Sequence, residues 1–174
     1  MDMKKRVRWE NVRGPKAILA VVIGTALGAG LAPVAPGTLG TLVGVPIHYF
    51  SADWSIAGRL TLWIGLTLIG IWAAQIFDRT MKSMDNQSIV IDEVVGFGIT
   101  AWTAGTHVNS LIVAFVLFRI LDIVKIPPVR QIDRWSKKRP GWSGFGVMAD
   151  DVMAAFQGLA IMLILQYFGI LPWA

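Results

Sequence analysis

Cysteine is absent from the 174-residue chain, and charged residues are scarce. The first absence excludes disulfide bonds, thiolate metal sites and a cysteine nucleophile. Charged residues make up 16% of the chain and hydrophobic residues 55%, with a mean hydropathy of +0.59. Soluble domains average about 25% charged residues. We therefore predict a single membrane-embedded domain over residues 1–174.

Nucleotide-binding loops are also missing. No G-x-x-x-x-G-K-[ST] sequence occurs, and "GTALGAG" does not match a dinucleotide fingerprint. The two histidines, His48 and His107, have no arginine or Ser-Gly pair beside them, so we interpret both as structural. The net charge of +5 does not indicate nucleic acid here, because the basic residues cluster just outside apolar segments. Anionic membrane lipids are the expected partner.

Long apolar stretches predict an all-α fold, a polytopic membrane helical bundle. A helix needs about 20 apolar residues to cross a bilayer. Three stretches approach this length: Ile56–Phe77, Asn109–Ile126 and Val152–Leu171. We count Ser88–Trp102 as a further, slightly short span.

Between residues 17 and 50, two apolar halves flank "GLAPVAPGTLG" and predict a broken N-terminal helical hairpin. We expect the helix to be interrupted at Gly30, Pro33, Pro36, Gly37 and Gly40. Irregular backbone at membrane depth is tolerated only when it is buried in protein or lines a wet cavity. The break is therefore expected to line a site, with a further span starting at about Thr38.

The distribution of lysine and arginine predicts the orientation. Six of these residues precede Ala17, two lie in "DRTMKSMDNQ", and six lie between Lys125 and Arg139, whereas the opposite loops contain only Arg59. Because positive residues favour the cytoplasmic side, all three basic regions are expected there, with about five net crossings. We expect the basic N-terminal segment to be retained and "GILPWA" to lie outside.

Acidic residues gather at the same predicted face. Asp92 and Glu93 start the apolar helix of "SIVIDEVVGFGIT", Asp122 lies near the end of the helix in "FRILDIVK", and "FGVMADDVMAAFQG" places Asp150 and Asp151 in the first turn of the last helix. Taken singly, such acids are more often helix caps or ion-pair partners. Three helix ends with carboxylates at one face predict a magnesium site, since this ion prefers oxygen ligands.

Basic residues accompany these acids. Arg119, Asp122 and Lys125 recur every three residues and share one helical face. They form either an interfacial ion-pair ladder or a site in which Arg119 and Lys125 bind a phosphate. The next segment, "PPVRQIDRWSKKRPGW", predicts a short helix or turn on the cytoplasmic surface, from which Asp133 and Arg134 can reach the site.

Four blocks of sequence resemble the phosphatidylglycerophosphatase A family: "GLAPVAPGTLGTL", "SIVIDEVVGFGI", "FRILDIVKIPPVRQIDR" and "GFGVMADDVMAA". They occur in the family's order and span residue 30 to about 155. The resemblance implies a magnesium-dependent lipid phosphatase that hydrolyses phosphatidylglycerophosphate to phosphatidylglycerol and inorganic phosphate in phospholipid biosynthesis. It also implies a multi-pass enzyme of the bacterial inner membrane, with the active site facing the cytoplasm.

The hypothesis assigns roles to ten polar residues of these blocks. Magnesium, as one ion or two, would be held by Asp92, Glu93, Asp122, Asp150 and Asp151; the phosphate would be bound by Arg119, Lys125, Arg134 and Thr38; Asp133 would act as a general acid or base. Water and an aspartate both remain open as the nucleophile. The alternative class is a small ion-coupled transporter or channel subunit with interfacial carboxylates, which leaves the accompanying arginine and lysine unexplained. The oligomeric state is left open.

Overall fold

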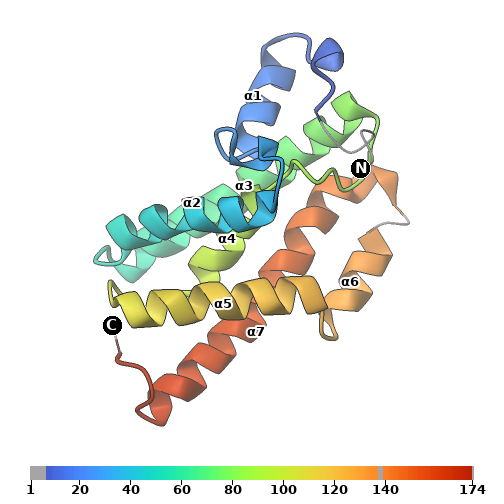
Figure 1. The fold of residues 1–174 in the computed structure, drawn as a ribbon. Coiled ribbons are helices and arrows are strands. Elements are labelled where there is room, and N and C mark those ends of the chain that lie inside the picture. Colours follow the sequence, from blue (N-terminus) through green and yellow to red (C-terminus); the bar gives the residue numbers. More distant parts are fainter. Residues whose placement is uncertain (1–6, 137–138, 174) are drawn as a thin grey trace.

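All regular structure in the computed structural model, which describes residues 7–136 and 139–173, is helical. The helices are α1 (Pro15–Gly24), α2 (Pro36–Ser51), α3 (Ile56–Met81), α4 (Ile91–Thr100), α5 (Val108–Val124), α6 (Val129–Ser136) and α7 (Ser143–Tyr167) (Figure 1). The all-α prediction is confirmed for these residues, and the segment predicted as a short helix or turn contains the short helix α6. Part of the orientation prediction rests on Lys4, Lys5, Arg6, Lys137 and Lys138, which lie outside the described residues.

Helix α4 forms the centre of the bundle, with α2, α3, α5 and α7 packed around it (Figure 1). All of its residues except Glu93 and Ile99 are buried. Neighbouring helices therefore cover the apolar side chains of "SIVIDEVVGFGIT". With 10 residues, α4 is about 15 Å long, roughly half the thickness of the hydrocarbon core.

Glycines on α2 allow a close approach to α4. A Cβ atom at Gly40 would lie 2.8 Å from the carbonyl oxygen of Val90, and one at Gly44 would lie 2.9 Å from that of Val94. Both distances are below ordinary van der Waals contact, so a larger residue would push the two helices apart. This packing places the first turn of α2 beside the first turn of α4.

The helix break is shorter than the sequence analysis predicted. Gly30 and Pro33 lie in the segment between α1 and α2, as expected, but Pro36 begins α2, and Gly37 and Gly40 lie inside it. The prediction was wrong for these three residues. Proline suits the first position of a helix, where no N–H bond is lost. The two glycines lie where α2 approaches α4 closely and leaves no room for a side chain.

Helix α7 begins at Ser143, two turns before the predicted start, so that Asp150 and Asp151 lie in its third turn. The expectation that they sit in the first turn was therefore wrong. The preceding turns pack against α3, where a Cβ at Gly144 would lie 2.6 Å from the backbone nitrogen of Gln75. Tertiary packing thus extends the helix through a glycine-containing segment with low intrinsic helix propensity.

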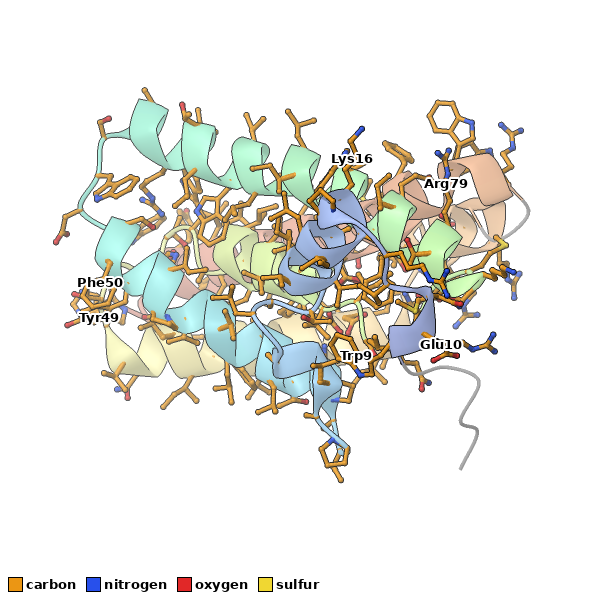
Figure 2. The ribbon with its side chains drawn as sticks, turned by 90° about the horizontal axis from the view of Figure 1, so that it is seen from above. Trp9, Glu10, Lys16, Tyr49, Phe50 and Arg79 are labelled. Carbon is orange, nitrogen blue, oxygen red and sulfur yellow. The ribbon has the colours of Figure 1, made fainter. Side chains whose placement is uncertain are left out.

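The bundle has two distinct ends. At the first, called here the acidic end, helices α2, α4 and α7 begin and helices α3 and α5 end. At the second, called the Arg59 end, α3 and α5 begin and α2, α4 and α7 end. Figure 2 shows Arg79 and Glu10 at the acidic end and Tyr49 and Phe50 at the Arg59 end. Residues predicted at one membrane face therefore lie at one end of the bundle.

Two helices, α3 and α7, are long and apolar enough to cross a membrane, with 26 and 25 residues. Helices α2, α4 and α5 have 16, 10 and 17 residues, fewer than the roughly 20 that a span needs. The prediction of about five crossings is not confirmed and stays a prediction. Exposed apolar residues recur at every fourth position on α3 and α5: Ile56, Leu60, Ile64 and Leu68, then Val108, Ile112, Val116 and Ile120. Soluble proteins rarely expose stripes of this kind.

Candidate metal and phosphate site

Three carboxylates meet at the acidic end. Asp92 and Glu93 come from the first turn of α4 and Asp151 from α7, and one oxygen of each lies within 4.8 Å of the others. Asp92 and Asp151 are buried, with 8% and 3% of their surface exposed. Carboxylates so close together repel one another and lose hydration. A divalent cation would offset both effects.

The free lone pairs of this cluster fit a metal ion. Glu93 Oε2 and Asp151 Oδ2 are buried and accept no hydrogen bond from the described residues. Asp92 Oδ1 accepts the backbone N–H of Glu93 at 3.1 Å, which holds that side chain against its own helix. Oxygen-only donors with vacant lone pairs suit magnesium, which keeps several waters and adds substrate phosphate oxygens.

Arg119 links α5 to this cluster. Its Nη1 atom lies 2.8 Å from Asp122 Oδ2 and 3.5 Å from Glu93 Oε1. Its Nε is buried without a partner among the described residues. The guanidinium is thus held beside the carboxylates by two ion pairs and keeps a donor for another anion. Asp122, which was predicted as a metal ligand, forms an ion pair with Arg119 in the structure.

Lys125 forms a second ion-pair group next to the first. Its ammonium contacts the carboxylate of Asp150 and lies 3.6 Å from Asp133 Oδ1. Asp150 Oδ1 has no partner among the described residues, although it is buried. Lys125 follows the last residue of α5 in a left-handed conformation (φ 48°), which turns the chain toward α6 and Asp133.

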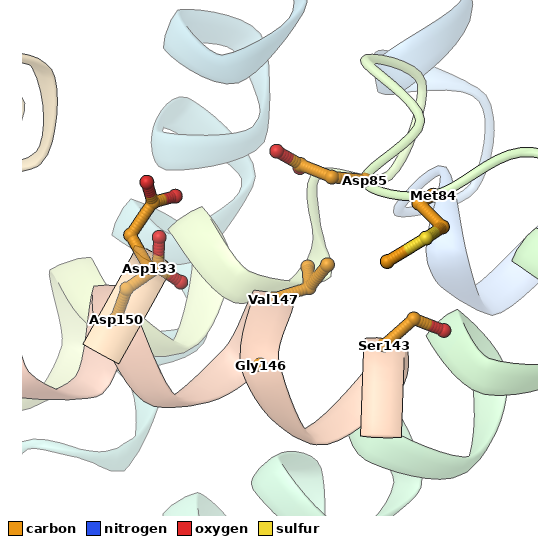
Figure 3. A pocket seen from close by; sticks show the side chains of 7 residues that line it. All are labelled: Met84, Asp85, Asp133, Ser143, Gly146, Val147 and Asp150. Atoms are coloured by element: carbon orange, nitrogen blue, oxygen red, sulfur yellow. The ribbon is translucent and has the colours of Figure 1, made fainter. Parts of the chain in front are cut away.

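A small pocket opens beside these two aspartates. Figure 3 shows Asp133 and Asp150 together at one edge of it, with Asp85 and Met84 from the α3–α4 loop and Ser143 from α7 around the rest. The volume of the pocket is about 20 Å³, enough for about one water molecule. Asp133 and Asp150 therefore line a space in which water can reach the ion-pair group.

The start of α2 closes the site from another side. A Cβ atom at Gly37 would overlap Glu93 Oε1 and would lie 3.1 Å from both terminal nitrogens of Arg119. The N-terminus of a helix carries unpaired N–H groups and a partial positive charge, which favours anions. Thr38, half-buried in the next position, shares this end of α2. The predicted break thus borders the site through the helix that follows it.

One predicted residue is placed apart from the others. Arg134 is exposed on α6 and forms no ion pair with the described acidic residues. Its neighbour Asp133 faces the site, since the two side chains lie on different sides of the helix. The structure therefore offers Arg119 and Lys125 as the basic groups of the site.

Two residues that position the site were not found from the sequence. Gly37 was expected only as a helix breaker. Asp78, buried at the end of α3, accepts the N–H groups of Asp85 at 3.0 Å and Asn86 at 3.3 Å and the hydroxyl of Ser83 at 3.3 Å. These bonds fix the loop that leads into Asp92. A short polar loop after an acid was the one available signal, and it is too common to be specific.

Comparison with known proteins defines the class. Its family match and its curated relatives identify the chain as a phosphatase enzyme, which agrees with buried carboxylates beside an arginine and a lysine. A family model for phosphatidylglycerophosphatase A matches residues 22–166, and the chain belongs to this family.

Curated relatives agree with the family. A phosphatidylglycerophosphatase A of Escherichia coli K12 is 33% identical, covering 91% of this chain and 86% of its own length. A protein of the same name from Haemophilus influenzae Rd is 32% identical, covering 90% and 92%. A putative phosphatidylinositol-3-phosphatase of Bacteroides thetaiotaomicron is 33% identical, covering 87% and 96%. No solved structure matches the chain significantly.

Proposed function

We propose that this protein hydrolyses phosphatidylglycerophosphate to phosphatidylglycerol and inorganic phosphate, with magnesium bound by Asp92, Glu93 and Asp151. Family membership and the names of two relatives support the substrate. The observation that carries the metal is the group of three carboxylate oxygens within 4.8 Å of one another, two of them from buried residues. Magnesium at this point would neutralise phosphate charge and activate a water molecule.

The chain's own residues then have separable tasks. Phosphoryl transfer depends mainly on positioning and on stabilisation of negative charge. Arg119 is placed to donate to phosphate oxygens from the α5 side, and the first turn of α2 from the other. Asp133, an ionised carboxylate held by Lys125 beside a water-sized pocket, is suited to act as a general base that accepts a proton from water. The arrangement accommodates either water or an aspartate as the attacking group.

The proposed location is the bacterial inner membrane, with the acidic end at the cytoplasmic face. The apolar helices α3 and α7 and the exposed apolar stripes support the membrane. The excess of lysine and arginine near the acidic end supports the orientation. In this position the acyl chains of the substrate stay in lipid while its doubly phosphorylated headgroup meets the polar groups.

Phosphatidylinositol 3-phosphate is a second candidate substrate. The relative from Bacteroides thetaiotaomicron is named as a putative phosphatidylinositol-3-phosphatase. Phosphatidylinositol 3-phosphate also carries a phosphate monoester on a lipid headgroup, so the carboxylates, Arg119 and Lys125 would meet the same group. The relative rates of phosphate release from the two lipids measure the selectivity for the headgroup. The ion-coupled transporter is not favoured, because family membership accounts for the same acids.

The test is phosphate release from each lipid in detergent micelles, with magnesium or with EDTA. Release should require the metal, and Asp151→Asn should lower the rate at least about 100-fold and weaken magnesium binding measured by calorimetry. Asp53→Asn, an exposed acid at the Arg59 end, is the matched control and should change neither quantity. A folded wild-type protein that releases no phosphate from either lipid with magnesium would overturn the proposal.

A further inference from the structure

Arg59 is a buried cation far from the acidic end. It lies in the first turn of α3 with 8% of its surface exposed. Its guanidinium stacks over the ring of Trp102, 4.1 Å from the ring centroid, and donates to the Trp102 carbonyl oxygen. The Nε atom is buried without a partner, and no ion pair among the described residues involves Arg59. A cation removed from water without a counter-charge is unfavourable.

An apolar groove starts at the same tryptophan. Trp102 lines it together with Leu60, Ile64 and Leu68 of α3 and Phe156 of α7, and its volume is about 510 Å³. Ile64, Leu68 and Phe156 are exposed, so the groove opens on the outer surface of the bundle. It lies between the two helices that are long enough to span a membrane.

A second groove of about 630 Å³ continues the first toward α6. Thr67, Val152 and Phe156 line both, and the second reaches Ile71 on α3. From Leu60 to Ile71 the helix rises about 17 Å, which is close to the depth of one bilayer leaflet, about 15 Å. The combined groove therefore has the length of an acyl chain within one leaflet, and Trp102, on which Arg59 stacks, lines one end of it.

We propose that this groove binds an anionic phospholipid, with an acyl chain along α3 and α7 and the phosphate at Arg59. The apolar walls match the acyl chain. The guanidinium, which has no ion-pair partner among the described residues, matches the phosphate, which arginine binds through several N–H donors. A zwitterionic phospholipid carries the same phosphate, but its own cationic group offsets that charge beside Arg59. The site is separate from the acidic end, at the other end of α3. The inference needs the proposed membrane location but not the phosphatase reaction.

The test is native mass spectrometry of the full chain in detergent, titrated with phosphatidylglycerol or phosphatidylcholine. The wild type should bind phosphatidylglycerol more tightly than phosphatidylcholine. Arg59→Gln should weaken phosphatidylglycerol binding about tenfold and remove the preference. Arg79→Gln, an exposed arginine at the acidic end of the same helix, is the matched control and should bind as the wild type does (Figure 2). Asp151→Asn should also keep the preference, which separates this lipid from product at the acidic end.

A second variant tests the groove itself. Ile64→Trp adds volume at an exposed position of the wall, so it should fold normally and lose binding of both lipids. Unchanged lipid binding in Ile64→Trp, or an unchanged preference in a folded Arg59→Gln protein, would overturn the proposal. So would a lipid-free wild-type dimer that Ile64→Trp dissociates, because the groove would then hold a second copy of the chain.

Discussion

Replacing Gly37 with alanine would put a methyl group between the two charged side chains that border the site. The new Cβ would overlap Glu93 Oε1 and crowd both terminal nitrogens of Arg119 at 3.1 Å. Since atoms in contact normally keep about 3.5 Å apart, Glu93 or the start of α2 would have to move by about 1 Å or more. A displacement of that size in a catalytic group costs roughly 100-fold in rate.

The assay for Gly37→Ala separates this loss from a loss of stability. Overpacking costs about 1–3 kcal/mol, which for a chain of this size lowers the Tm by about 2–12 °C. We expect kcat for phosphate release, measured well below the Tm, to fall about 100-fold. Gly65→Ala is the control, because a Cβ at Gly65 meets nothing within 4 Å. Full activity of Gly37→Ala with unchanged magnesium dependence would refute the close approach of α2 to Glu93.

Three further substitutions test the charged groups. Arg119→Gln should lower kcat/KM for phosphate release about 10- to 100-fold, whereas Arg134→Gln should change it less than about threefold; equal effects would contradict the placement. Lys125→Gln leaves Asp150 without its cation and should lower the free energy of unfolding in detergent by about 1–3 kcal/mol, less than for a fully buried pair because the lysine is 28% exposed. Asp78→Ala leaves loop N–H groups unpaired, so it should cost about 1–3 kcal/mol and speed hydrogen exchange over residues 83–88; protection as in the wild type would argue against its role.

The two ion-pair groups explain how so many acids gather at one end. Arg119 compensates Asp122 and approaches Glu93, while Lys125 compensates Asp150 and Asp133. The remaining charge is concentrated on the three-carboxylate cluster. In the proposed reaction a cation bound there would relieve this repulsion, so metal and substrate phosphate would favour each other's binding at this end.

Local pattern determined the helices and the end at which the acids lie. Apolar stretches of helical length predicted α3 and α5, and the "DE" pair was correctly placed in the first turn of α4. Start and stop positions depended on packing as well. Pro36 was taken for a breaker and begins a helix, and α7 starts two turns early because Gly144 packs on α3. The sequence shows that a glycine has a low helix propensity, but it does not show that the backbone of another helix will pack against that glycine.

Tertiary structure alone decided which carboxylates lie together and what surrounds α4. Asp150 and Asp151 are adjacent in sequence, yet on a helix neighbouring side chains point about 100° apart, so Asp151 joins Asp92 and Glu93 while Asp150 meets Lys125. Which direction faces which helix depends on how the helices pack around one another. The apolar run of α4 predicted a membrane span and lies buried in the bundle. Lipid and protein interior favour the same apolar residues, so composition cannot distinguish them, whereas the packing of neighbouring helices does.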